Sequence, residues 1–371
     1  MSDIDRRRII AGLSQLRTGL NDIPAKTAGN FLLATWNIRK FGGGKFGGRI
    51  SDAFYYIAEC INRFDLVAVQ EVRQDLLALK KVARLLGKDW DYIFSDVSFA
   101  DGGNSERLAF LYNRSRVHFT GLAGELVLPG KSATKRMAQL ARSPFICGFQ
   151  AGWAKFNLCT VHIYYGTGKK DNPRRIDEIG ALAKLLANKA KSYIQIDDPI
   201  SYSPENLILL GDFNIFGRED ATFKALTDNG FVIPKPLLRE QGSNIAKDKF
   251  YDQIAFFGET RGIDASKAGV FDFYKYVFND ADAFEGTTLL PPAAAFTMWR
   301  TYQMSDHLIM WTEFNVDKTD TYLKSLAESE GEAATSPPTG ATKKKTKKAQ
   351  ARKAAAKKTA ASKKKKKAAT R

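Results

Sequence analysis

Two polar residues, Asp212 and Asn214, follow a strongly apolar run in the stretch NLILLGDFNIFGRED at residues 206–220. A short apolar run that ends in glycine and polar residues predicts a buried strand followed by a loop. Because the two residues lie two apart, an extended chain would project both side chains to the same side. A carboxylate that accepts a proton beside an amide that holds an oxygen suits hydrolysis. The same residue types also form Asx turns at strand ends, so this stretch alone leaves both interpretations open.

Polar or ionisable residues lie at the margins of five further apolar runs. These runs are FLLATWNIR with Asn37, DLVAVQEVR with Glu71, FNLCTVHIYYG with His162, FYDQIAFF with Asp252, and MSDHLIMW with Asp306 and His307. One such residue alone is commonly a satisfied edge residue, whereas several on neighbouring strands predict a shared site. Asn37, Glu71 and Asp306 offer the hard oxygen ligands that suit Mg²⁺ or Mn²⁺, and the chain lacks the His and Cys clusters that zinc prefers.

Strand-like and helix-like runs are mixed along the chain. We expect strands at residues 31–36, 65–70, 91–94, 107–112, 144–149, 153–161, 206–211, 250–257 and 307–314. Helix-like runs lie at 51–63, 74–86 and 174–191, and residues 1–30 form a helical segment with Ile9, Leu13, Leu16 and Leu20 at helical spacing. This mixture favours layered sheets with outer helices in one domain of roughly 300 residues.

The positive charge of the chain is concentrated in its C-terminal tail. Residues 341–371 carry 15 Lys and Arg and no acidic residue, so removing them from the net charge of +17 leaves +2 for residues 1–340. A Lys/Ala-rich stretch without large apolar residues cannot bury a core, and we expect residues 331–371 to be disordered when free. Such a tail would bind nucleic acid phosphates without sequence preference, although a purely solubilising role is the alternative.

The remaining composition predicts an intracellular protein. No apolar run reaches the 18 residues needed to span a bilayer, and the N-terminus lacks the pattern of a secretory signal. Cys60, Cys147 and Cys159 are odd in number and widely spaced among apolar neighbours, which is typical of reduced core cysteines. We expect a bacterial cytoplasmic, nucleoid-associated location, with a nuclear one as the alternative that Lys-rich clusters permit.

Seven short motifs together resemble one known superfamily. In chain order they are TWNIRKFGG, VQEVR, SERLAFLY, TVHIYYG, GDFN, YDQI and SDH. The set resembles the endonuclease/exonuclease/phosphatase superfamily, most closely its deoxyribonuclease I-like members, over about residues 31–314. The resemblance implies an α/β fold, a four-layer α-β-β-α sandwich with two mixed β-sheets, occupying residues 31–316.

The resemblance also implies a metal centre and a water-activating pair. It places Asn37 and Glu71 at a divalent metal, Mg²⁺ or Mn²⁺, with Asp306 in the same metal-proximal group. Asp212 would orient or deprotonate the attacking water, while Asn214 would hold a phosphate oxygen.

Two histidine–carboxylate pairs follow from the same resemblance. His162 would hydrogen-bond the scissile phosphate or a proton in transit, with Glu106 as its orienting carboxylate. His307 would act from the other side with Asp252 as its partner. A neighbouring carboxylate raises the pKa of an imidazole and fixes its tautomer, so each pair can act near neutral pH.

Three arginines match positions that contact duplex DNA in the deoxyribonuclease I pattern: Arg39, Arg73 and Arg142. Guanidinium groups there favour phosphate contacts or minor-groove insertion, whereas the alternative for each is an ordinary ion pair. The pattern departs at Asn104, which stands where the family sets an aromatic residue.

Three functions are therefore open. The first is a monomeric, metal-dependent DNA endonuclease inside the cell, with RNA as a further substrate to test. The second is a hydrolase of the same superfamily that acts on a phosphomonoester or a phospholipid head group. A polybasic tail can also bind anionic lipid, so the tail is compatible with this alternative. The third is a catalytically inactive DNA-binding protein.

Overall fold

The computed structural model describes residues 3–99, 102–130, 139–194, 206–258, 265–281 and 295–317, together with Phe284, Thr319 and Leu323. Residues 1–318 make one compact unit. The expected disordered tail, residues 331–371, lies outside the described residues. Among the helices that are described, none is both long enough and apolar enough to cross a bilayer.

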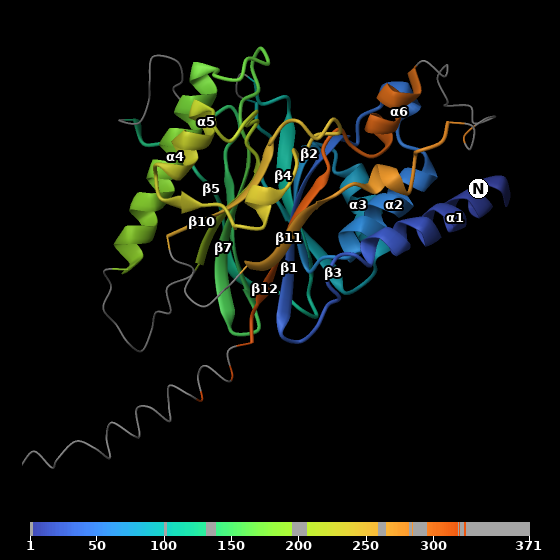
Figure 1. Cartoon of the computed structure of the whole chain (residues 1–371), viewed down its shortest axis with the longest axis horizontal. Helices are drawn as coiled ribbons and strands as arrows, with labels where there is room; N and C mark the ends of the chain where they lie inside the picture. The colour runs from blue at the N-terminus through green and yellow to red at the C-terminus, as the bar shows by residue number, and fades with distance from the viewer. Residues whose placement is uncertain are drawn as a thin grey trace, which may run out of the picture. The chain divides into compact units, whose positions relative to one another are not determined.

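Two six-stranded β-sheets lie face to face (Figure 1). The first sheet contains, in spatial order, β11 (Ala265–Phe271), β12 (Ile309–Asn315), β1 (Asn30–Phe41), β2 (Leu66–Arg73), β4 (Glu106–Asn113) and β3 (Trp90–Phe94). The second contains β5 (His118–Glu125), β6 (Phe145–Ala151), β7 (Ala154–His162), β8 (Asn206–Asp212), β10 (Asp252–Phe257) and β9 (Phe231–Val232). The pairs β1–β2 and β7–β8 are parallel, and the other pairs are antiparallel. Both sheets are therefore mixed, as expected.

Helices cover the outer faces of the two sheets (Figure 1). The first sheet is covered by α1 (Asp3–Leu20), α2 (Ser51–Asn62) and α3 (Leu77–Leu86), and the second by α4 (Pro173–Ile194) and α5 (Ala221–Thr227). A further helix, α6 (Phe296–Gln303), lies beyond the end of the first sheet. This arrangement confirms the four-layer α-β-β-α sandwich.

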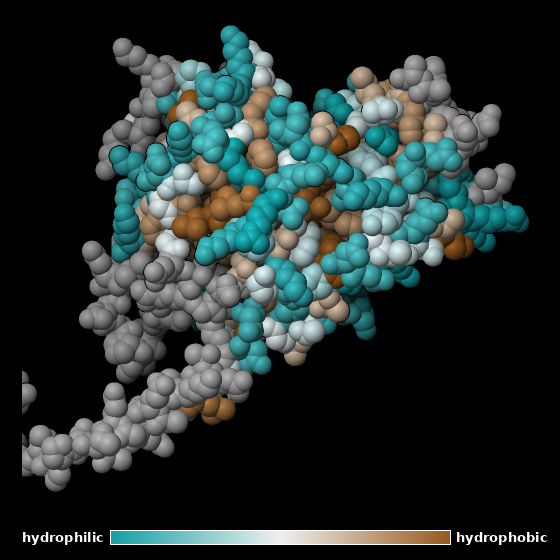
Figure 2. Space-filling model, in the orientation of Figure 1, coloured by the Kyte–Doolittle hydropathy of each residue, from teal (hydrophilic) through white to brown (hydrophobic). Residues whose placement is uncertain are grey.

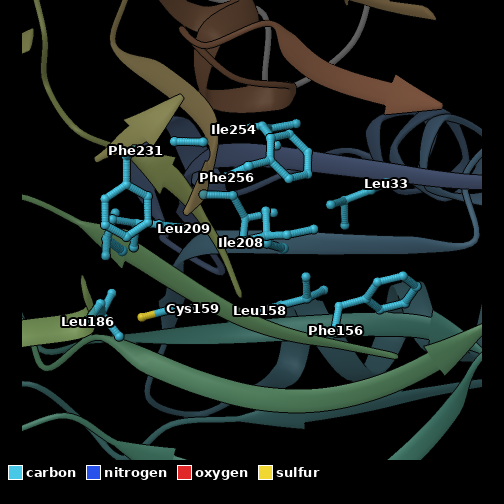
Figure 3. Packing of buried hydrophobic residues seen from close by; sticks show 14 of the residues in the cluster. Leu33, Phe156, Leu158, Cys159, Leu186, Ile208, Leu209, Phe231, Ile254 and Phe256 are labelled. Atoms are coloured by element: carbon cyan, nitrogen blue, oxygen red, sulfur yellow. The ribbon is translucent and has the colours of Figure 1, made fainter. Parts of the chain in front are cut away.

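The central strands are mostly apolar because both of their faces are covered. In the second sheet, Cys159 of β7 lies next to Leu186 of α4, whereas Leu158 lies on the side that faces Leu33 of the first sheet (Figure 3). Successive residues of a strand alternate between faces, so a strand covered on both sides needs an uninterrupted apolar run. All three cysteines are buried and unpaired, which agrees with the expected reduced state.

Three strands and two helices of the described chain were not expected from the sequence. Strand β5 is exposed along most of its length, so it lacks the apolar alternation that marks a half-buried strand. Strand β11 is an edge strand that begins with small and basic residues, ASKAG, and β9 has only two residues. The helices α5 and α6 have seven and eight residues, too short for a clear helical period.

Candidate active site

The polar residues of the second sheet come together through its strand register. In the β7–β8 ladder His162 pairs with Asp212, and in the β8–β10 ladder Asp252 pairs with Asp212. The three side chains therefore lie in one row at one edge of the sheet. Gly211, with φ of +134°, makes this possible: a Cβ there would lie 2.2 Å from the Val161 carbonyl oxygen. Only glycine tolerates that approach and that dihedral.

A β-bulge in β2 orients the side chain of Glu71 in the first sheet. The register of β2 against both β1 and β4 shifts around Glu71, whose φ is +61°. A bulge inserts one unpaired residue into a strand and redirects its side chain. The Glu71 Oε2 atom accepts a hydrogen bond of 2.7 Å from the Lys40 backbone amide, which fixes the carboxylate at the end of β1.

Three polar contacts join the two sheets at this edge. The Asn37 Nδ2 atom donates to Asp212 Oδ2 at 2.9 Å. In the second contact, His162 Nδ1 lies 3.0 Å from Glu106 Oε2. The third joins His307 Nδ1 to Asp252 Oδ2 at 2.8 Å. Each pairing crosses from one sheet to the other, so the site exists only when the two sheets are packed together.

The two imidazoles converge on one carboxylate oxygen. The Nε2 atom of His162 lies 3.4 Å from Asp212 Oδ2, and the Nε2 atom of His307 lies 3.8 Å from the same oxygen. Asp252 bonds to the Nδ1 atom of His307, whereas Glu106 lies within ion-pair distance of His162 Nδ1 without hydrogen-bond geometry. Both Nε2 atoms face the space around Asp212. The structure thus brings each histidine within 3.0 Å of its expected carboxylate, and the roles of the two pairs stay predictions.

Buried charges set the ionisation of this cluster. Burial alone would raise the pKa of Glu106, but His162 and Arg142 outweigh it and lower that pKa to about 2. Burial would likewise lower the pKa of His307, but Asp252 and Asp212 outweigh it and hold that pKa well above its usual value. This shift favours the imidazolium form of His307, which is the form that has a proton to donate.

The expected metal position is built from oxygen donors. The Asn37 Oδ1 atom is buried and has no hydrogen-bond partner, so it can act as a ligand to a cation. Burial, then Glu106 and Asp306, raise the pKa of Glu71 against an opposing effect of His162. Glu71, Glu106 and His162 also present ligand atoms within 4.8 Å of one another. Because Glu106 is already paired, Glu71 and Asn37 fit a hard divalent ion better.

Asp306 lies at the outer side of this position. Its side chain is 40% exposed, and its Oδ2 atom lies 3.4 Å from the Arg39 Nε atom. A second trio, Asp212, Asp252 and His307, also brings ligand atoms within 4.8 Å. In that trio Asp252 is tied to His307 and Ser243. The assignment of Asn37, Glu71 and Asp306 to the metal stays a prediction.

The three arginines differ in their surroundings. Arg142 is buried beneath the site, where its Nε atom donates to Glu106 Oε2 at 2.8 Å and Nη1 donates to the His162 carbonyl at 3.3 Å. Arg39 stacks over the Tyr302 ring of α6 at 4.1 Å. Arg73 is partly exposed, and its Nη1 atom donates to the carbonyl of Asn104 at 3.1 Å. Arg39 and Arg73 thus lie at the rim of the site, whereas Arg142 holds Glu106 in place. Contacts of the three arginines with a substrate stay predictions.

Asn214 bonds to the backbone of its own sheet. Its Nδ2 atom donates to the Ile163 carbonyl at 2.8 Å, and its backbone amide donates to Asp212 Oδ1 at 2.8 Å. Its φ of +53° gives the tight turn that allows the second bond. Asn214 therefore fixes the Asp212 carboxylate, and its contact with a phosphate oxygen stays a prediction.

Two serines in the site were not singled out from the sequence. The Ser243 hydroxyl donates to Asp252 Oδ2 at 2.6 Å, and Ser305 Oγ accepts from the His307 backbone amide at 3.0 Å. Ser305 had a sequence signal, because a serine two residues before a histidine can form a local hydroxyl–amide turn. Ser243 had none, since its partner lies nine residues away on the far side of a loop.

The site opens at one end of the sandwich. The outline of the molecule has a notch there, between the end that carries α6 and the end that carries α5 (Figures 1 and 2). One wall of the opening is cationic, with Arg39 and Lys45 over the Tyr302 ring at 4.1 and 4.8 Å. An anionic substrate would therefore meet positive charge at the rim before it reaches the imidazoles.

Comparison with solved structures shows the same fold. The human Nocturnin catalytic domain with a bound sulfate anion superposes with a TM-score of 0.51 at 15% identity, covering 79% of this chain and 95% of that one. A humanised D. rerio TDP2 gives 0.50 at 14% identity over 78% and 100% of the chains. A mannosyl-6-phosphatase from Bacteroides thetaiotaomicron gives 0.50 at 16% identity over 76% and 99%. No curated protein matches the sequence.

The sequence itself matches one family model. Residues 34–326 match the model described as the Endonuclease/Exonuclease/phosphatase family, and this range contains every residue of the site described above. The chain therefore belongs to the endonuclease/exonuclease/phosphatase family of hydrolases.

Proposed function

We propose that this protein is a divalent-metal-dependent phosphodiesterase that cleaves nucleic acid, acting as an intracellular DNA endonuclease. The observation that carries the proposal is the convergence of two imidazoles on Asp212, with His162 Nε2 and His307 Nε2 lying 3.4 and 3.8 Å from its Oδ2 atom. A base flanked by two hydrogen-bond donors suits attack of water on a phosphate held between them.

Each residue has a defined part in the proposed hydrolysis. Asp212 accepts a proton from water as the water oxygen bonds to phosphorus in line with the ester oxygen that leaves. His162, held by Glu106, donates a hydrogen bond to a non-bridging oxygen and stabilises its developing charge. His307, held as the imidazolium by Asp252, gives its Nε2 proton to the leaving oxygen as the P–O bond breaks.

The donor set fits a hard divalent cation. Asn37 and Glu71, with Asp306 at the outer side, would hold Mg²⁺ or Mn²⁺, and the orphaned Asn37 Oδ1 atom supports this placement. The ion would neutralise charge on the phosphate oxygens in the transition state. Glu71 lies close enough to Glu106 for the two carboxylates to repel each other. A bound cation would reduce this repulsion.

Two features favour a polyanionic substrate over a small phosphate ester. The cationic wall at Arg39 and Lys45 flanks the opening, and residues 341–371 carry 15 Lys and Arg. The tail adds avidity for nucleic acid without sequence preference. We propose a monomer that works near the nucleoid of a bacterium, or in a nucleus.

The test is nicking of supercoiled plasmid by the full-length protein. We expect nicking with Mg²⁺, none with EDTA, and a loss of about 10² to 10⁴ in rate for Asp212→Ala and for His307→Ala. Trp153→Ala is the matched control, because Trp153 is exposed at the opposite end of β7. Inositol phosphates and sphingomyelin, assayed in parallel, test the other substrates of the family. Nicking that persists unchanged in both variants would indicate a contaminant and support the inactive DNA-binding protein instead.

A further inference from the structure

Three aromatic side chains extend outward from the proposed catalytic histidine. The ring centroids of His307 and Tyr251 lie 5.4 Å apart, with 33° between their planes. Phe216 packs edge-on against Tyr251 at 5.3 Å, and Tyr165 lies against Phe216 at 6.1 Å with nearly parallel rings. We call Tyr165, Phe216 and Tyr251 the aromatic platform.

The chain places each member of the platform beside a residue of the site. Tyr165 comes three residues after His162 at the end of β7, and Tyr251 directly precedes Asp252 at the start of β10. Phe216 follows Asn214 by two residues. The platform is therefore fixed to the same strand ends that hold the catalytic groups, on the second-sheet side and away from the cationic wall.

A buried arginine holds the platform in place. Arg175 has no exposed surface, and its guanidinium lies over the Phe216 ring at 4.9 Å. Its Nε atom donates to the Tyr164 carbonyl at 3.1 Å, and Nη2 donates to the Tyr165 carbonyl. A fixed aromatic surface loses little conformational entropy when it binds a ligand.

The side chains of the aromatic platform are more exposed to solvent than those of a core cluster. Tyr165 is 44% exposed, whereas Phe216 and Tyr251 are half-buried. By contrast, the aromatic pair Trp36 and Phe273 is buried completely. A core cluster gains its stability from being covered, so an open aromatic face beside a catalytic site is available for a ligand.

We propose that the aromatic platform stacks on the nucleobase of the nucleotide next to the scissile phosphate, and that this base must be unpaired. The inference rests on the proposed nuclease function and names its substrate class as single-stranded or locally opened nucleic acid. In a duplex both faces of each base are occupied by its neighbours, so only an unstacked base offers a face to Tyr165. Stacking tolerates any base, which agrees with the sequence-independent binding of the tail.

The test uses the full-length protein with an oligothymidylate that contains one 2-aminopurine. In EDTA, where cleavage is suppressed, stacking on the platform quenches the 2-aminopurine fluorescence. With Mg²⁺ we expect the single strand to be cleaved faster than a duplex of the same sequence. Tyr165→Ala raises the KM for the single strand by about 5- to 150-fold, reduces the preference for it and abolishes the quench.

Two variants serve as controls. Tyr165→Phe retains an aromatic face and keeps the quench. Trp153→Ala removes a ring that is 56% exposed, against 44% for Tyr165, and that lies before the other end of β7. If the wild type quenches and cleaves but Tyr165→Ala behaves as Trp153→Ala does, the platform is refuted and the nuclease stands. If the wild type cleaves no nucleic acid under any condition, the proposed function itself is refuted.

Discussion

Replacing Glu106 by glutamine tests the electrostatics of the site, because this carboxylate serves two partners. Its Oε2 atom lies 2.8 Å from Arg142 Nε and 3.0 Å from His162 Nδ1, and its side chain is only 4% exposed. Glutamine keeps the shape and removes the charge. The variant therefore leaves a buried guanidinium without its counter-ion and an imidazole without its orienting carboxylate.

The expected loss of stability can be worked out in two ways. A pKa of about 2 against an ordinary value of 4.5 corresponds to roughly 3 kcal/mol at neutral pH, at about 1.4 kcal/mol per pH unit. Removing one partner of a buried ion pair typically costs about 3–5 kcal/mol. Both routes predict that Glu106→Gln lowers the free energy of unfolding by about 3 kcal/mol at pH 7.

The sign of the pH dependence follows from the lowered pKa. Glu106 contributes its full stabilisation above about pH 4.5 and loses it as the pH falls toward 2, because protonation then makes it equivalent to glutamine. Urea unfolding followed by tryptophan fluorescence at pH 7, 5, 4 and 3 should show the wild type and Glu106→Gln converging as the pH falls.

An exposed ion pair supplies the control for this experiment. Glu59 on α2 pairs with Arg17 on α1 at 2.7 Å, but the Arg17 side chain is 66% exposed. Glu59→Gln should cost less than about 1 kcal/mol, because solvent screens such pairs. A Glu106→Gln deficit that is as small as that of Glu59→Gln, or that stays constant from pH 7 to pH 3, would refute the assigned charge pairing.

Three further predictions concern the backbone, the metal and the substrate. Gly211→Ala should destabilise the protein by at least about 3 kcal/mol in thermal unfolding, because its Cβ would meet a β7 carbonyl oxygen at 2.2 Å. Gly124→Ala should not destabilise it in this way, because the space around Gly124 is open. Glu71→Gln should raise the Mg²⁺ concentration for half-maximal nicking about tenfold or more without lowering the melting temperature, and an unchanged requirement would remove Glu71 from the metal site. Arg39→Ala should weaken DNA binding and reduce the slope of log K against log salt by about one, whereas Arg17→Ala on α1 should leave the slope unchanged.

Much of the site could be predicted because strand ends carry a local signal. An apolar run that stops at Asp212 or Asn37 indicates a buried strand and its margin, and the margins of neighbouring strands meet at one edge. The four-layer fold followed from the family motifs, which the match over residues 34–326 supports. The central strands were the easiest to place, since full burial requires a continuous apolar sequence.

Other features depend on partners that are distant in sequence. The bulge at Glu71 is visible only as a register shift against two neighbouring strands. Arg142 lies in a loop where a surface ion pair was equally reasonable, and only the packed structure shows its buried contact with Glu106. Strand β5 escaped detection because its exposed residues carry no period that a single sequence could reveal.

Among the described strands, β12 of the first sheet is the last to be synthesised. Strand β12 inserts between β1 and β11, and His307 lies two residues before it. A nascent chain therefore holds Asp212 and His162 well before the second imidazole leaves the ribosome. The proposed nuclease would therefore complete its catalytic residues only after translation has passed β12.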